Sequence, residues 1–458
     1  MDSGLLYCRG FLVALSAPSV VPAAYARKSR ILWLDLRTSF VESGDVDQDW
    51  VGIVGLVVDT ATSGRTGADI ARELCEQLLI DEPAMLSMTD RLSGRFVVLF
   101  KRHDQPLRIV GDACGTRAVA YASRGGIAAM HAKLVADNLS GAPVDPLVTD
   151  FMGGYPGRAT PYDGVRLLTP NTVLTLETGA IARFYPREPI RRCAVSDVID
   201  EVQARLRTCL RAVADRAPLV MSLTAGLDSR ATLAAVIESH VPIETFTFFT
   251  EDPSTREDVR RAAEIAGELG LGHTVITADC PITDVRPSFD AAITANAIGR
   301  HGPHVYQRVF DHYRGRDLVH VRSNLVEIGR GFWRRYEINV RSIDGLVALY
   351  SRIQKRDLTA NESRLVRSLF LDFRVSTDFN AASLLGIDPR QLLYWEHRMG
   401  CWLSQVLIEG DPAFETVNPW NCRSLLEALL SVSTGEQLRG VVPRRMIARA
   451  GLDRWSFS

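Results

Sequence analysis

One short run, residues 219–230, constrains the fold of this chain more than any other. Its sequence is Leu-Val-Met-Ser-Leu-Thr-Ala-Gly-Leu-Asp-Ser-Arg, in which apolar residues lead directly into small, hydroxyl-bearing and acidic ones. A helical stretch, Ala231 to Glu238, follows this run. Small residues let the backbone approach an anion, N–H groups at a helix start point toward it, and hydroxyl groups add donors. The run therefore predicts a phosphate-binding turn between a strand and a helix.

The acid inside this turn, Asp228, adds a second expectation. A carboxylate beside a phosphate is repelled unless a divalent cation lies between the two, so the turn indicates a nucleotide site with Mg²⁺. The run is not a Walker loop, which ends in Gly-Lys-Ser/Thr, and it has no G-x-G-x-x-G fingerprint of a dinucleotide site.

Composition narrows the class of protein. A chain of 458 residues has room for two or three domains, at roughly 150 residues each. The net charge of −1 argues against a nucleic acid or an anionic membrane as partner. No stretch reaches the roughly 20 apolar residues of a membrane helix. The scattered cysteines form no C-x-x-C pair, which is typical of reduced thiols in a cytoplasmic protein.

The pattern of elements divides the chain near residue 187. Residues 1–187 contain short β-branched or apolar runs separated by turn residues, the first of them Leu5 to Ser16, and one clear helix, Thr66 to Leu79. This composition predicts an α+β domain of layered sheets. From residue 188, strands and helices alternate through His273 to Ile276, which predicts an α/β domain with a parallel sheet. The remainder is expected to be mainly helical, apart from a strand at Leu318 to Val321.

The 222–230 segment resembles the pyrophosphate-binding loop of ATP pyrophosphatases, in the form found in the asparagine-synthetase-like family. Further segments with similarity to that family occur in the same order along the chain, at residues 92–97, 111–117, 162–170 and, more loosely, 319–330. The resemblance covers nearly the whole chain. It implies a glutamine amidohydrolase (Ntn) type domain over 1–187. For 188–458 it implies an adenine-nucleotide α-hydrolase-like synthetase domain with a helical C-terminal part.

Two departures from the family are informative. Glutamine-using members carry a cysteine nucleophile directly after the initiator Met, whereas this chain has Asp2. A carboxylate cannot replace a thiolate in acyl transfer, so the first domain is expected to be inactive, as in β-lactam synthetases and lasso-peptide cyclases. Cys8 is expected to be buried within the first strand. In the second half, Val326 replaces one acid of the family's acidic pair, and no lysine follows Lys355.

The resemblance implies a set of site residues. ATP would be bound by Ser222, Thr224, Ala225, Gly226, Leu227, Asp228, Ser229, Arg230, Phe248 and Asp258. Mg²⁺ would be held by Asp228 and Glu327, and Arg445 would supply the positive charge of the missing lysine. Asp258 is equally well explained as an acid at a helix start, and Arg445 as a solvated residue.

Two further segments are candidates for binding the substrate. His301, Gly302, His304 and Tyr306 form a candidate substrate loop. The region from Tyr394 to Leu430 forms either an acyl-acceptor pocket or part of a helical core. For His397 we favour a place in the core.

These features predict an AMP-forming ligase that adenylates a small-molecule or peptide carboxylate and joins it to an amine, without glutamine. A peptide macrocyclase of the lasso type, which requires a precursor peptide, is one alternative. An ATP-binding but catalytically weak partner or regulatory protein is the other.

Overall fold

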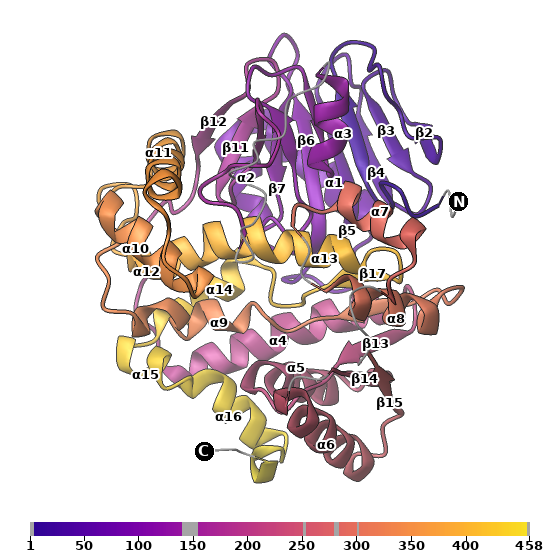
Figure 1. Ribbon diagram of the computed structural model, residues 1–458, viewed down its shortest axis with the longest axis vertical. Helices are drawn as coiled ribbons and strands as arrows, with labels where there is room; N and C mark the ends of the chain where they lie inside the picture. The colour runs from indigo at the N-terminus through magenta and orange to yellow at the C-terminus, as the bar shows by residue number, and fades with distance from the viewer. Residues whose placement is uncertain (1–3, 140–153, 251–252, 279–283, 300–301, 456–458) are drawn as a thin grey trace.

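The computed structural model describes residues 4–139, 154–250, 253–278, 284–299 and 302–455 (Figure 1). These residues form two antiparallel sheets, one parallel sheet and a set of C-terminal helices. The mixed α/β and α+β class is therefore as predicted at this level. The Ntn assignment and the boundary between 1–187 and 188–458 stay predictions.

The first half of the chain builds two six-stranded sheets, with strand orders β10-β8-β9-β1-β3-β2 and β12-β11-β7-β6-β5-β4. The strands of the first sheet are β1 (Phe11–Ala14), β2 (Tyr25–Arg27), β3 (Leu32–Asp35), β8 (Ala120–Ala122), β9 (Ile127–Ala129) and β10 (Val165–Leu167). Those of the second are β4 (Phe40–Gly44), β5 (Trp50–Asp59), β6 (Leu92–Lys101), β7 (Arg108–Gly111), β11 (Thr172–Thr175) and β12 (Ala180–Arg183). A 3₁₀ turn, η1 (Thr89–Arg91), precedes β6.

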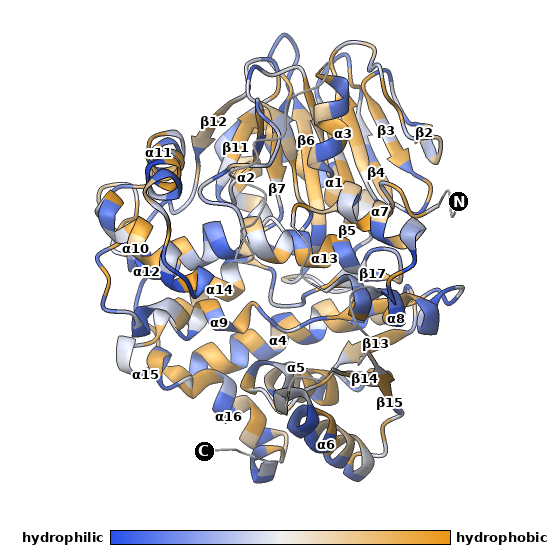
Figure 2. Ribbon diagram, viewed as in Figure 1, coloured by the Kyte–Doolittle hydropathy of each residue, from blue (hydrophilic) through white to orange (hydrophobic). Residues whose placement is uncertain are grey.

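These two sheets pack face to face because alternate residues of each strand point into a shared core. Trp50 and Val54 of β5 belong to the same buried cluster as Phe11 of β1 and Leu32 of β3. The opposite face of β5 is covered by α1 (Gly67–Ile80) and α2 (Glu82–Met88), and α3 (Ala132–Asn138) packs with the first sheet. Every residue of β5 is buried, and Figure 2 shows the hydrophobic colouring of these central strands.

The N-terminus departs from the predicted first strand. Cys8 is buried, as expected, but it lies in a turn that precedes β1. The turn is held by Asn296 of the second half, whose side chain accepts from the Tyr7 N–H at 2.6 Å and donates to the Leu5 carbonyl at 2.8 Å. Because the Tyr7 N–H and the Leu5 carbonyl pair with Asn296, they are not available to extend β1 toward the N-terminus.

The second half is built on a five-stranded sheet with order β15-β14-β13-β16-β17, in which all neighbouring strands are parallel. Its strands are β13 (Leu219–Ser222), β14 (Ile243–Phe249), β15 (His273–Thr277), β16 (Val319–Val321) and β17 (Glu415–Val417). The segment after residue 321 is mainly helical, as expected, but it also contains the short strand β17, which the sequence did not predict. Its three residues are too few to give a strand pattern, and it forms because it pairs with β16.

Helices surround this sheet and continue to the C-terminus. The first are α4 (Val195–Ala214), α5 (Leu227–Ser239), α6 (Pro253–Glu268), α7 (Pro287–Asn296) and α8 (Pro303–Tyr313). After β16 come α9 (Val326–Gly329), η4 (Phe332–Arg335), α10 (Ile343–Gln354), α11 (Ala360–Ser376), α12 (Pro389–Leu393), the π-helix η5 (Tyr394–Leu403) and α13 (Ser404–Gly410). The last are α14 (Arg423–Ser431), α15 (Thr434–Leu438), α16 (Val441–Arg449) and η6 (Asp453–Trp455). No helix in the described part of the chain is long and apolar enough to cross a membrane.

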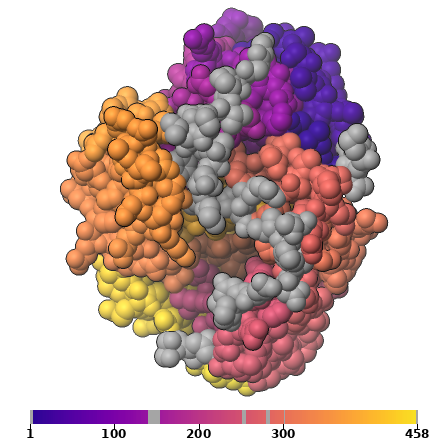
Figure 3. Space-filling view, in the orientation of Figure 1, coloured from indigo at the N-terminus to yellow at the C-terminus, as the bar shows by residue number. Residues whose placement is uncertain are grey.

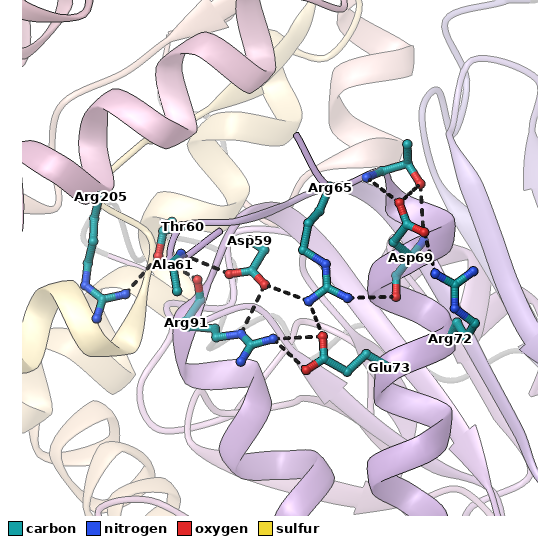
Figure 4. A network of polar contacts seen from close by, with 10 residues as sticks. Asp59, Thr60, Ala61, Arg65, Asp69, Arg72, Glu73, Arg91 and Arg205 are labelled. Atoms are coloured by element: carbon teal, nitrogen blue, oxygen red, sulfur yellow. Dashed lines mark hydrogen bonds and ion pairs between the residues drawn. The ribbon is translucent and has the colours of Figure 1, made fainter. Parts of the chain in front are cut away.

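In the space-filling view, the first half of the chain lies at the top of the molecule and most of the second half lies below it (Figure 3). A charged network on one side joins the two halves (Figure 4). Arg91 donates to Asp59 at the end of β5 at 3.1 Å and to Glu73 of α1 at 2.8 Å. Thr60 donates to the Arg91 carbonyl at 2.7 Å and accepts from Arg205 of α4 at 3.2 Å. The network therefore ties the end of β5 to α4, the longest helix among the described residues of the second half.

A buried ion pair joins the halves more centrally. The side chains of Arg95 in β6 and Asp411, which follows α13, both have 0% exposure. Arg95 donates to both Asp411 oxygens, one of them at 2.9 Å. Burial raises the pKa of Asp411, and the neighbouring Arg95 guanidinium opposes that rise. Beside this pair, Arg117 donates to Glu415 of β17 at 2.6 Å.

Arg95→Met is therefore expected to destabilise the protein strongly, because it leaves the Asp411 carboxylate buried without its partner. The expected loss is about 3–5 kcal/mol in the free energy of unfolding, measured by urea denaturation. Arg72→Met removes an exposed ion pair with Asp69 and should change stability by about 0.5 kcal/mol or less. Equal effects of the two substitutions would contradict a structural role for the buried pair.

His397 lies in the helical core, as the sequence favours. Its side chain is buried in η5, with the rings of Phe370 and Phe373 at 5.3 and 6.1 Å. Burial lowers the pKa of His397 from the usual 6.5 to about 4, and a hydrogen bond to the Tyr155 carbonyl opposes this effect.

Stability should therefore fall as the pH drops from 6.5 toward 4, because the unfolded chain binds a proton at His397 that the folded chain excludes. At pH 4.5 this contribution is about 2–3 kcal/mol. In urea denaturation at pH 7 and 4.5, His397→Gln should reduce the stability difference between the two pH values by that amount. His103→Gln, at an exposed histidine, should leave the difference unchanged. An unchanged difference in His397→Gln would show that this histidine is not the source.

Candidate functional site

A cavity of about 380 Å³ opens at the carboxyl ends of the parallel strands. It lies where the strand order reverses between β13 and β16, which is where open α/β sheets bind ligands. The apolar part of its lining includes Phe246, Val305, Val309 and Phe414, which belong to one buried cluster, and also Leu407. The polar part of its lining includes Thr224, Gly226, Asp228, Ser229, Glu327 and Arg330.

The turn between β13 and α5 contributes several of the polar lining residues. Ser229 donates to the Thr224 carbonyl at 2.9 Å and accepts from the Thr224 N–H at 3.3 Å, which closes the turn on itself. The Thr224 hydroxyl accepts from the Gly226 N–H at 3.2 Å. Gly226 is the N-cap of α5 and provides no side chain to cap it. The helix start therefore faces the cavity in the manner of an anion-binding site.

Three of the predicted residues support the turn from outside the cavity. The Ala225 N–H donates to Asp258 of α6 at 2.9 Å, and the Ala225 carbonyl accepts from Arg230 at 3.1 Å. Arg230 also donates to the Trp455 carbonyl near the C-terminus at 2.9 Å. Burial raises the pKa of Asp258, whereas the hydrogen bond from Ala225 lowers it. These contacts position the turn and do not line the cavity.

The acidic residues Asp228 and Glu327 come together in the segments that follow the paired strands β13 and β16. Arg330 bridges them, with its Nη2 atom 3.1 Å from Asp228 Oδ2 and 3.4 Å from Glu327 Oε1. Asp228 Oδ1 is buried and has no hydrogen-bond partner within the described residues. Burial raises the pKa of Asp228 to about 7, and Arg330 acts against that rise.

This pair of acids fits a divalent cation shared with phosphate oxygens. Mg²⁺ is usually bound through one or two carboxylates together with substrate phosphates, and Asp228 Oδ1 is an unused acceptor at that position. Within the described ranges, no group of three or more His, Cys, Asp and Glu residues could hold a metal by itself. A cation here would therefore depend on the phosphates for the rest of its coordination.

Two residues of the site, Tyr394 and Arg330, were not among the predicted site residues. Tyr394, the first residue of η5, donates a hydrogen bond to Glu327 Oε2, and burial raises its pKa well above the usual value. Arg330 is the second such residue. The only sequence signal for Tyr394 was its place at the edge of a polar and aromatic region, because the contact with Glu327 spans 67 positions.

The other predicted residues lie as follows. Ser222, Leu227 and Phe248 line the cavity. Tyr306 of the candidate substrate loop lines it too, but Tyr306 and His304 lie in helix α8, so the prediction of a loop is wrong for these two residues. His301 of that loop lies outside the described residues. Ser222 contacts His320, with 3.1 Å between Oγ and Nε2. Arg445 is exposed on α16 and does not line the cavity, so its predicted catalytic role stays a prediction.

No family model and no curated protein matches this chain. Among solved structures, NMN synthetase from Francisella tularensis is similar over 45% of this chain and 94% of its own, with 12% identity and a TM-score of 0.22. A glutamine-dependent NAD⁺ synthetase from Acinetobacter baumannii, solved with adenosine diphosphate, is similar over 50% of this chain and 48% of its own, with 13% identity and a TM-score of 0.22. At this sequence identity and TM-score, neither structure identifies the function of this chain.

Asp258→Ala is expected to loosen the turn, because it removes the acceptor of the Ala225 N–H. The loss of a hydrogen bond to a charged group should weaken the ATP binding that the sequence predicts about tenfold, as measured by titration calorimetry. Glu257→Ala is the matched control, since that neighbour on α6 is exposed and pairs with Arg260 and Arg261. If both variants bind ATP like the parent protein, Asp258 does not hold the turn in its binding geometry.

Proposed function

We propose that this protein is an ATP-dependent, AMP-forming ligase that activates a carboxylate and joins it to an amine as an amide. The observation that carries this proposal is the convergence of the 224–229 turn, Asp228 and Glu327 on one cavity at the sheet's switch point. A phosphate-binding turn beside an acidic pair suits a nucleotide with its cation. The apolar lining residues suit the uncharged part of a ligand.

The reaction follows from this arrangement. The turn binds the β- and γ-phosphates, so that the α-phosphorus faces the substrate acid. An oxygen of the carboxylate attacks the α-phosphorus, the bond to the bridging oxygen breaks, and pyrophosphate leaves. The amine then attacks the activated acyl carbon, loses a proton and displaces AMP. Mg²⁺ bound between the acids and the phosphates would neutralise the charge that develops on pyrophosphate.

The amine is proposed to come from the substrate and not from glutamine. Asp2 lies outside the described residues, so this proposal keeps its basis in the sequence. Cys8, the cysteine nearest the N-terminus, offers no replacement nucleophile, because burial raises the pKa of its thiol to about 12. A thiol with such a pKa remains protonated at neutral pH and is a poor nucleophile.

A catalytically weak nucleotide-binding protein is the second candidate function. Val326 is buried and apolar where the family resemblance implies a further acid. A lasso-type macrocyclase remains a special case of the ligase, in which a precursor peptide would supply both acid and amine.

Asp228→Ala is expected to abolish pyrophosphate release. Purified protein with ATP, Mg²⁺ and a panel of carboxylates and amines should release pyrophosphate in a manner that depends on the acid, and the variant should fall at least 100-fold below it. A circular dichroism spectrum like that of the parent would show that the variant folds.

Retained activity in the variant would refute the role of Asp228, and failure of the parent protein to bind ATP would refute the proposed ligase function. Glutamate formed from added glutamine would overturn the proposed amine source.

A further inference from the structure

Two arginines, Arg322 and Arg330, are the cationic side chains among the described residues that line the cavity. Arg322 donates to neutral groups, the Asn324 amide oxygen at 2.6 Å and the Tyr306 hydroxyl at 3.4 Å. Arg330 instead contacts both carboxylates of the acidic pair. The positive charge that a divalent cation would bring to the pair is therefore already partly supplied by the chain.

The contact uses only part of the Arg330 guanidinium. Nη2 makes both hydrogen bonds to the acids, whereas Nε is buried without a hydrogen-bond partner in the described part of the chain. The guanidinium lies over the Phe332 ring, 5.6 Å from its centroid, and the side chain is 26% exposed. An arginine carries five N–H donors in a planar fork that suits phosphate oxygens, so donors remain available while the acids are bound.

We propose that Arg330 is the resident cation of the acidic pair: it competes with the divalent ion for Asp228 and Glu327, and it turns to the phosphates when the nucleotide enters. This proposal rests on the nucleotide site of the proposed function. The two acceptor oxygens that Arg330 occupies belong to the carboxylates that a metal ion would use. A metal ion that takes these oxygens releases a guanidinium beside the phosphate-binding turn.

This role also accounts for the positive charge at the site. No lysine follows Lys355 in the sequence, and Arg445 is exposed away from the cavity. Arg330 is placed to supply the phosphate-binding cation that the sequence led us to expect at Arg445. A guanidinium stays charged at every accessible pH, so the acids keep a counter-ion in the absence of metal.

The competition is tested by Mn²⁺ binding to the nucleotide-free full-length protein, measured by electron paramagnetic resonance. Arg330→Met and Arg330→Gln should bind Mn²⁺ at least tenfold more tightly than the parent. Arg334→Met is the matched control, because Arg334 pairs with Asp388 at 3.2 Å outside the cavity, and it should match the parent within twofold. Mn²⁺ affinity that is unchanged or weaker in both Arg330 variants overturns the proposal.

The phosphate role is tested by calorimetric titration of pyrophosphate in the presence of EDTA. The parent and Arg334→Met should bind it, and both neutral Arg330 variants should bind at least tenfold more weakly. Arg330→Lys keeps the charge and should stay within about threefold of the parent. Equal pyrophosphate affinity in the parent and the neutral variants overturns this role. Neither titration requires turnover. If the affinities are as expected but no ligase activity is found, the proposed function is refuted and the role of Arg330 is not.

Discussion

The reversal of strand order between β13 and β16 is the constraint on which the rest of the site depends. Strands on either side of this point send their following segments to opposite faces of the sheet, so the space beyond β13 and β16 is not filled by a crossover. The turn that begins α5 and the short helix α9 border this space, and Arg330 links their acids at 3.1 and 3.4 Å. Without the bridge, two carboxylates would face each other across a partly buried gap, which is unfavourable for both.

The first half of the chain supports this geometry through ion pairs with residues in and next to β17. Its buried Arg95 and Arg117 hold Asp411 and Glu415, at the turn into β17 and in that strand. The edge strand β17 has only three residues, and Thr416 within it lines the cavity. The two antiparallel sheets of the first half therefore support the edge strand β17, and through it one wall of a cavity that is lined by residues of the second half.

Hydrophobic patterning and small residues allowed the turn and the two strands beside it to be predicted from the sequence. The meeting of Asp228 with Glu327, 99 positions apart, was predicted only through the family resemblance. Arg330 and Tyr394 were missed because a lone arginine or tyrosine in a helical segment has no distinctive pattern, and their partners are fixed by tertiary packing. Arg445 was chosen for its position late in the chain, where the family has a lysine, yet α16 leaves it exposed. β17 was missed because three residues that pair only through tertiary contacts show no periodicity.

Amide hydrogen exchange of the full-length protein, with and without ATP and Mg²⁺, tests most directly whether phosphates bind at this turn. The account predicts that peptides covering residues 222–230 exchange at least tenfold more slowly when the nucleotide is present. It also predicts little change in the strands of the two antiparallel sheets. Exchange at 222–230 that is unaffected by a saturating nucleotide, or protection confined to another region, would contradict the account.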